Sequence, residues 1–149
     1  FWGGWLTYDN AAKESLLGVP AEVLRDHGAV SEECARAMAE GALARSGATH
    51  ALAITGIAGP SGGTADKPVG TVHLALATQG MATWSRRQLN PFDRETFKFV
   101  TSQQALDIGL VVTGDDLGVV PSQSAVVHLG LEVAGEPLEG DKWWRVWHL

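Results

Sequence analysis

Residues 50–64 read HALAITGIAGPSGGT, and this stretch decides the fold. The apolar run His50–Ile54 predicts a short buried β-strand. Residues 55–68 carry four glycines and two prolines, which predict a loop. Glycines in such a loop let a ligand approach backbone N–H groups at the carboxyl end of a strand. The stretch therefore predicts an anion-binding loop, and a mobile connection without a ligand is the alternative interpretation.

The loop belongs to neither of two common phosphate-binding motifs. It is not a Walker A loop, because no Gly-Lys-Ser/Thr follows its glycines. It is not a dinucleotide-binding fingerprint either, because no helix is predicted to open at its end.

Strands and a helix are predicted after this loop. Thr71–Ala77 and Ala82–Leu89 are predicted strands, and the turn at Gly80 is short enough to make them an antiparallel hairpin. Residues Phe92–Ile108 are predicted to be a helix, because apolar side chains recur along one face. That face comprises Phe92, Phe97, Val100, Ala105 and Leu106. After Gly109 only short strands or loops are predicted.

Three helices are predicted before residue 50. They are Ala11–Leu17 after the caps Asp9 and Asn10, Ala21–His27 after Pro20, and a helix that opens after Ser31 and ends at Gly47. In the third helix one buried stripe is predicted, comprising Cys34, Ala37 or Met38, Ala42 and Leu43. Trp5–Tyr8 is predicted to be a short strand. Because helices and strands alternate, the sequence predicts an α/β layered domain.

Composition excludes several classes of protein. The 149 residues are 45% hydrophobic and 19% charged, which is typical of one soluble globular domain. The net charge of −6 argues against nucleic-acid binding, which needs a basic face. The chain has a single cysteine, Cys34, which excludes an intramolecular disulfide and a thiolate-rich zinc site. We expect a cytoplasmic protein with no membrane partner, because neither a membrane-spanning run nor a signal-peptide pattern is present.

Metal chemistry is not expected. The five histidines are scattered, and no HExxH or paired-histidine spacing occurs. We therefore expect neither a metal nor another cofactor. A GxSxG nucleophile elbow is absent as well.

Tyr8 and Lys13 form the second functional candidate. They lie five residues apart at a predicted strand-to-helix junction, so both polar ends can reach one pocket. A lysine whose pKa is lowered by burial or by a nearby cation can act as a general base. A tyrosine hydroxyl can relay a proton or stabilise an oxyanion. The alternative is that Lys13 is an ordinary solvated charge.

Arg94 is the third candidate. An arginine at the start of a helix can bind phosphate through two hydrogen bonds, assisted by the helix dipole. The alternative is a surface ion pair within Asp93-Arg94-Glu95.

Several stretches together carry a resemblance to a known family. They read GGWLTYDNAAK at 3–13, LLGVP at 16–20, GAVSEE at 28–33, TGIAGP at 55–60, GGT at 62–64, KPVGTV at 67–72 and FDRETFK at 92–98. In this order they resemble the CinA C-terminal domain, also known as the PncC-type nicotinamide-nucleotide amidase. The resemblance extends over residues 1 to about 109.

The resemblance implies a fold and an activity. The implied fold is a three-layer α/β/α sandwich around a mixed sheet. The implied activity is hydrolysis of the carboxamide of nicotinamide mononucleotide, which yields nicotinic acid mononucleotide and ammonia without a metal. Tyr8 and Lys13 would lie beside the nucleophile, with Lys13 as the base. The nucleotide would be held by Asn10, Thr55, Gly56, Gly59 and Arg94.

Two departures from the family leave alternatives open. The family's nucleophilic serine lies in a Glu-Ser-Cys-Thr-Gly-Gly motif, which would fall upstream of Phe1. The domain over residues 1–109 is therefore expected to lack its N-terminal strand and helix. A catalytically inactive nucleotide-binding remnant, or a structural module, is the alternative function.

The second departure is the end of the chain. Residues 110–149 match nothing in the family and are predicted to be an unassigned C-terminal extension. Its tryptophans, Trp143, Trp144 and Trp147, are expected to pack on the domain or on another copy of the chain, the latter giving a homo-oligomer.

Overall fold

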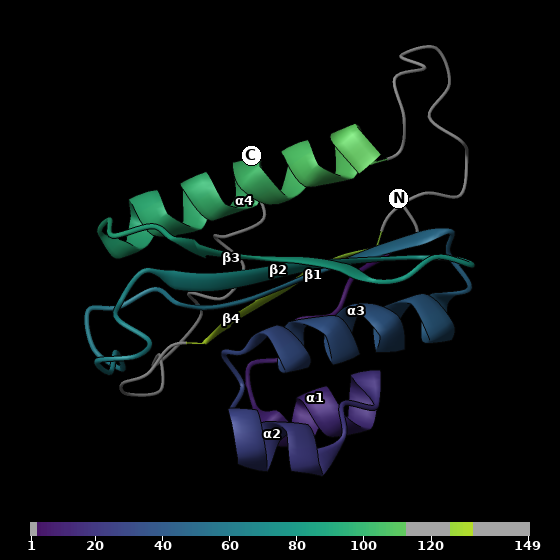
Figure 1. The fold of residues 1–149 in the computed structure, drawn as a ribbon, viewed down its shortest axis with the longest axis horizontal. Helices are drawn as coiled ribbons and strands as arrows, with labels where there is room; N and C mark the ends of the chain where they lie inside the picture. Colours follow the sequence, from purple (N-terminus) through teal and green to yellow (C-terminus); the bar gives the residue numbers. More distant parts are fainter. Residues whose placement is uncertain (1–2, 113–125, 133–149) are drawn as a thin grey trace.

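A computed structural model describes residues 3–112 and 126–132 as three layers. One sheet lies between α4 on one side and α3, with α1 and α2 beyond it, on the other (Figure 1). The helices are α1 (Asn10–Leu17), α2 (Ala21–His27), α3 (Glu32–Ser46) and α4 (Arg94–Val112). The strands are β1 (His50–Ile57), β2 (Thr71–Thr78), β3 (Trp84–Leu89) and β4 (Val126–Glu132). The α/β/α prediction is confirmed.

The sheet is mixed, as predicted. Its strand order is β3-β2-β1-β4. The predicted hairpin of β2 and β3 is antiparallel, and β1 pairs antiparallel with β2. β4 runs parallel to β1 at the edge, with Ile57 opposite Glu132. The carboxyl ends of β1 and β4 therefore lie at the same end of the sheet, the end from which the β1–β2 loop leaves β1.

Each face of the sheet carries its own apolar core. On the α3 side, small side chains predominate, and Ala51 and Ala53 of β1 share one buried cluster with Met38 of α3. On the α4 side, larger side chains pack around Phe97. The cluster comprises Phe97 together with Leu52, Ile54, Ala58, Val72, Leu74, Leu76 and Ala105. Alternate residues of β1 thus point to opposite layers, as in any strand.

Close approach of α1 to α3 depends on Gly41. A Cβ atom at this position would lie 1.8 Å from the carbonyl oxygen of Leu17, the last residue of α1. The end of α1 therefore packs against α3 at Gly41, the one position of α3 that has no side chain. This contact holds the helix that carries Lys13.

The boundaries of α1 and α3 follow from local capping and agree with the prediction, except that α1 begins at Asn10, one residue earlier than expected. The Asp9 carboxylate accepts a hydrogen bond from the Ala11 N–H at 2.7 Å, and Gly18 ends α1 in the left-handed conformation. The Ser31 hydroxyl accepts from the Cys34 N–H at 3.1 Å, and Gly47 ends α3. The predicted stripe of α3 is buried at Cys34, Met38 and Ala42, whereas Ala37 and Leu43 are only partly buried.

One strand prediction was wrong, and another was too short. Trp5–Tyr8 is not a strand: residues 3–8 have no regular secondary structure, and Asp9, the cap of α1, lies in a bend. β1, in contrast, continues three residues past Ile54, into the predicted loop. Gly56 allows this extension, because a Cβ atom there would come within 3.1 Å of the Phe97 ring.

The predicted helix 92–108 is displaced. It begins at Arg94, because the Asp93 carboxylate caps the Glu95 and Thr96 N–H groups, each at 3.1 Å. It continues past Gly109 to Val112. Phe97 and Ala105 are buried as predicted, but Phe92 and Leu106 are about half exposed. Phe92 precedes the helix, and Leu106 points away from the sheet.

The region after residue 109 is described only in part. The strand predicted there is present as β4, and β3 begins at Trp84 rather than at Ala82. The predicted packing of Trp143, Trp144 and Trp147 lies outside the described residues. The domain boundary at residue 109 stays a prediction. Within residues 3–112 and 126–132, no helix has the length and apolarity that a bilayer crossing requires.

Candidate functional site

The β1–β2 loop, residues 58–70, is anchored at several points. Its end is tied to β1 by a hydrogen bond from the Gly70 N–H to the Ile57 carbonyl at 2.8 Å. The Thr64 hydroxyl accepts from the Lys67 N–H at 3.1 Å, and the Lys67 ammonium donates to the His27 carbonyl at 2.7 Å. The loop is thus fastened both to itself and to the end of α2.

Arg94 lies against this loop. It is the first residue of α4, and its guanidinium donates to the carbonyl of Gly59 at 3.3 Å. Asp93 and Glu95 have other partners: Asp93 caps the helix, and Glu95 pairs with Lys98 at 2.8 Å. Hydrogen bonds from Thr96 hold the pKa of the Asp93 carboxyl below its usual value. Arg94 is therefore oriented by the loop.

Lys13 is buried, with 1% of its surface exposed. Its ammonium donates to the main-chain carbonyl of Tyr8 at 3.0 Å. Tyr8 itself is 38% exposed. The predicted proximity of these two residues is confirmed, but the contact uses the Tyr8 backbone. A buried ammonium fixed by a carbonyl is held in one place, which proton transfer at a defined atom requires.

The other predicted substrate residues have different surroundings. Thr55 and Gly56 lie inside β1 and are buried. The Thr55 hydroxyl donates to the Ala29 carbonyl at 2.8 Å, which ties β1 to the connection between α2 and α3. Asn10 is the exposed first residue of α1.

The structure brings the predicted residues together in two groups. Tyr8, Asn10 and Lys13 gather at the start of α1, in the layer on the α3 side. Gly59 and Arg94 meet where the β1–β2 loop contacts the start of α4, the helix on the other side of the sheet (Figure 1). Binding of a substrate by both groups stays a prediction.

A polar group that sequence reasoning did not single out faces α3 beside the loop. His73 is 7% exposed and lies opposite Arg87 and Thr55 in the sheet. Among the described residues, its Nδ1 atom and the Thr71 hydroxyl are buried without a hydrogen-bond partner. Burial, followed by the charges of Arg87 and Lys67, lowers the pKa of His73. The one available signal was a histidine in the middle of a buried strand.

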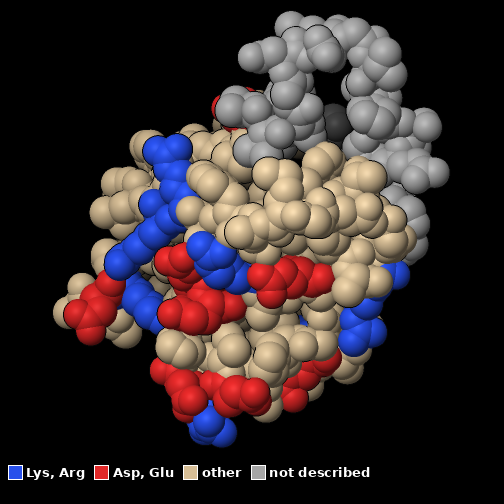
Figure 2. All heavy atoms as spheres, turned by 45° about the vertical axis from the view of Figure 1, so that its right-hand side comes forward, with Lys and Arg blue, Asp and Glu red and all other residues tan. Residues whose placement is uncertain are grey.

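Metal-binding side chains do not converge in the described part of the chain. No group of three or more His, Cys, Asp or Glu side chains there could hold an ion. Charged side chains of both signs are interspersed on the face shown in Figure 2. One surface ion pair joins Arg36 and Glu32 of α3 at 3.0 Å.

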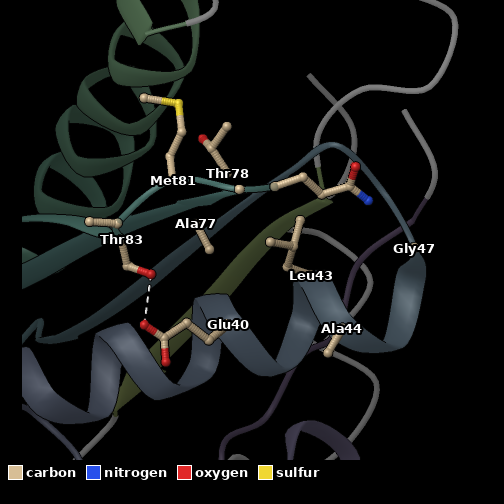
Figure 3. Close-up of a pocket in the computed structure, with 11 residues that line it drawn as sticks. Glu40, Leu43, Ala44, Gly47, Ala77, Thr78, Met81 and Thr83 are labelled. Carbon is tan, nitrogen blue, oxygen red and sulfur yellow. Dashed lines mark hydrogen bonds between the residues drawn. The ribbon is translucent and has the colours of Figure 1, made fainter.

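A shallow hollow of about 540 Å³ lies away from the candidate residues. It is formed by the C-terminal half of α3 and the turn between β2 and β3, with Glu40 hydrogen-bonded to Thr83 at 2.7 Å (Figure 3). β2 starts next to the β1–β2 loop and ends at this hollow, so the two features are at opposite ends of the strand.

Comparison with known proteins places this geometry in a family. Residues 1–111 match the CinA C-terminal domain. The chain belongs to the CinA C-terminal domain family. A CinA-like protein of Akkermansia muciniphila is 56% identical over 103 residues, which are 69% of this chain and 25% of that protein. A CinA-like protein of Geotalea daltonii is 55% identical over 109 residues, covering 72% and 26%. The chain thus spans about a quarter of the length of these CinA relatives.

Solved structures of CinA proteins share the fold. The competence/damage inducible protein CihA of Agrobacterium tumefaciens superposes with a TM-score of 0.70 at 42% identity, over 72% of this chain and 66% of that one. A CinA superfamily protein of Escherichia coli superposes with a TM-score of 0.67 at 35% identity, over 71% and 61%.

Proposed function

We propose that this CinA domain takes part in hydrolysing the carboxamide of nicotinamide mononucleotide to nicotinic acid mononucleotide and ammonia. One structural observation carries the proposal: the buried Lys13 ammonium, held 3.0 Å from the Tyr8 carbonyl. A lysine is seldom fully buried without a specific reason. The substrate itself comes from the family resemblance.

The proposed chemistry is acyl transfer to a serine. The serine of the family's Glu-Ser-Cys-Thr-Gly-Gly motif, which is not among these 149 residues, attacks the amide carbon. Lys13, as a neutral amine, accepts the serine proton and passes it to the departing ammonia. Tyr8 assists by donating a hydrogen bond to the oxyanion or by relaying the proton. Water then hydrolyses the acyl-serine to the carboxylate.

Substrate binding is assigned to the β1–β2 loop and Arg94. Arg94 supplies a fixed positive charge for the phosphate, and Gly59 supplies backbone close to it. Asn10, Thr55 and Gly56 complete the proposed binding residues. Thr55 and Gly56 would act from within β1, by shaping the base of the loop. The net charge of −6 argues against a nucleic-acid partner but leaves room for one phosphate at a local cation, and no membrane partner is proposed.

The test is ammonia release from nicotinamide mononucleotide by a version of the chain extended upstream through the serine motif. Lys13→Met should reduce kcat by about 10²–10⁴-fold, the usual contribution of a general base. Lys98→Met is the matched control, because Lys98 pairs with Glu95 on the surface of α4. Full activity of the Lys13→Met protein would refute the assignment.

An inactive nucleotide-binding module is the second candidate. The observation that favours it is the contact between Arg94 and the Gly59 carbonyl, because a cation held beside the loop serves phosphate binding without any catalytic group. It predicts binding of the mononucleotide without turnover, even by the extended version. A homo-oligomer formed through the tryptophan-rich end remains a separate prediction, tested by light scattering of the chain with and without residues 140–149.

A further inference from the structure

Two kinds of contact fasten α4 to the sheet beyond Arg94. The first is apolar: the Phe97 ring packs where Gly56 has no side chain. The second is polar and centres on Asn90, which follows β3 and is 4% exposed. Its amide nitrogen donates to the Gln104 side-chain oxygen at 2.8 Å and to the Thr101 hydroxyl at 3.1 Å.

Asn90 also holds the chain on its other side. The Gln104 amide donates back to the Asn90 side-chain oxygen at 3.2 Å, which closes a reciprocal pair. The Asn90 N–H donates to the Gly70 carbonyl at 2.8 Å. Gly70 is the last residue of the β1–β2 loop and bonds back to Ile57. Asn90 therefore contacts both the end of the loop and the middle of α4.

We propose that the Asn90–Gln104–Thr101 cluster is a positioning device that sets α4 so that Arg94 meets the β1–β2 loop. This rests on the proposed role of Arg94 in substrate binding. The apolar contacts of Phe97 and Ala105 hold α4 on the sheet but are not directional, whereas the hydrogen bonds of the cluster fix the position of the helix. Gln104 lies about 15 Å along the helix from Arg94, too far to touch a ligand held there. Its effect on binding can therefore act only through the placement of α4.

Burial of Asn90 and Thr101 makes the loss of a hydrogen bond in this cluster costly. Asn90 is 4% exposed, so loss of the Gln104 amide leaves the Asn90 side-chain oxygen without this hydrogen bond in the interior. A shift of α4 that admits water to the Asn90 side chain is then favoured, because water replaces the lost hydrogen bond. A shift of this kind lengthens the 3.3 Å contact between Arg94 and Gly59, which has little margin as a hydrogen bond.

The experiment is a double-mutant cycle on the 149-residue chain, with nicotinamide mononucleotide affinity measured by calorimetry. Gln104→Ala should weaken binding by about threefold to tenfold, and should have no further effect in an Arg94→Ala background. Gln103→Ala is the matched control: it removes the same amide one residue away, from the exposed face of α4, and should leave affinity unchanged. An undiminished Gln104→Ala effect in the Arg94→Ala background, or no effect at all, overturns the inference.

A second readout separates this inference from the proposed function. If Arg94→Ala leaves the affinity unchanged, or if no binding is seen, the proposed role of Arg94 fails. The inference is then decided by the urea midpoints of the same four proteins. Positioning predicts that the midpoint shift caused by Arg94→Ala disappears when Gln104 is already Ala. Additive shifts in the two backgrounds overturn it.

Discussion

Gly41→Ala should loosen the helix that carries Lys13. The added Cβ atom would lie 1.8 Å from the Leu17 carbonyl oxygen, and 2.9 Å from the Leu17 carbonyl carbon. A carbon needs about 3.3 Å from an oxygen, so α1 has to move by about 1.5 Å, and backbone cannot rotate aside as a side chain can. Overpacking of this kind costs about 1–3 kcal/mol or more.

Helix propensity acts in the opposite direction and makes the prediction sharp. Alanine is favoured over glycine inside a helix by about 1 kcal/mol. If the Leu17 contact were unimportant, Gly41→Ala would therefore stabilise the protein. We expect a net loss of about 2 kcal/mol, which lowers Tm by about 8 °C in a domain of this size.

Thermal unfolding followed by circular dichroism measures the change. Gly3→Ala is the control, because a Cβ atom at Gly3 meets nothing within 4 Å, and its Tm should match that of the parent chain. Since Gly41 supports α1, the variant should also lose amidase activity in the extended version. A Tm equal to or above that of the parent would refute the reasoning about α1.

Three further predictions concern charge and ligand. Arg94→Ala should weaken nicotinamide mononucleotide binding by about 1.5–3 kcal/mol, the value of a charge-assisted hydrogen bond, and unchanged affinity by calorimetry would remove Arg94 from the site. In the folded chain the pKa of His73 is lowered from its usual 6.5, so the unfolded chain takes up the proton more readily and the free energy of unfolding falls as the pH drops below about 6.5. The urea midpoint should therefore fall between pH 7.5 and 5.5, and His73→Gln should make that fall smaller. An equal fall in the variant would contradict this role of His73. Amidase activity of the extended version should survive exhaustive chelation, whereas loss that a divalent ion restores would establish metal chemistry.

Local signals in the sequence predicted the helices well. Asp9 and Ser31 cap their helices through bonds to residues two and three positions away, so the pattern is visible in a short window. The proximity of Lys13 and Tyr8 is equally local. What the spacing could not predict is that the lysine would bond to a backbone carbonyl, since this depends on how the chain enters α1.

The errors arose where distant residues decide the structure. β1 extends to Ile57 because β2 and β4 pair with it and because the Phe97 ring fills the space beside Gly56. β2, β4 and Phe97 are all distant from β1 in the sequence. The contact between Arg94 and Gly59 joins residues 35 positions apart and was not predicted; the family resemblance implied only that both residues hold the nucleotide. Trp5–Tyr8 has strand-forming residues, but it pairs with none of the four strands in the described part of the chain.

The most direct test of the proposed function compares ammonia release from nicotinamide mononucleotide by two proteins at equal concentration. One is the 149-residue chain, and the other is the version extended upstream through the Glu-Ser-Cys-Thr-Gly-Gly motif. Lys13 and Tyr8 can assist a nucleophile but do not replace the serine, so the extended version should turn over the substrate and the 149-residue chain should show little or no activity. Equal turnover by the two proteins would show that the nucleophile lies within these 149 residues and would contradict the assignment of the site.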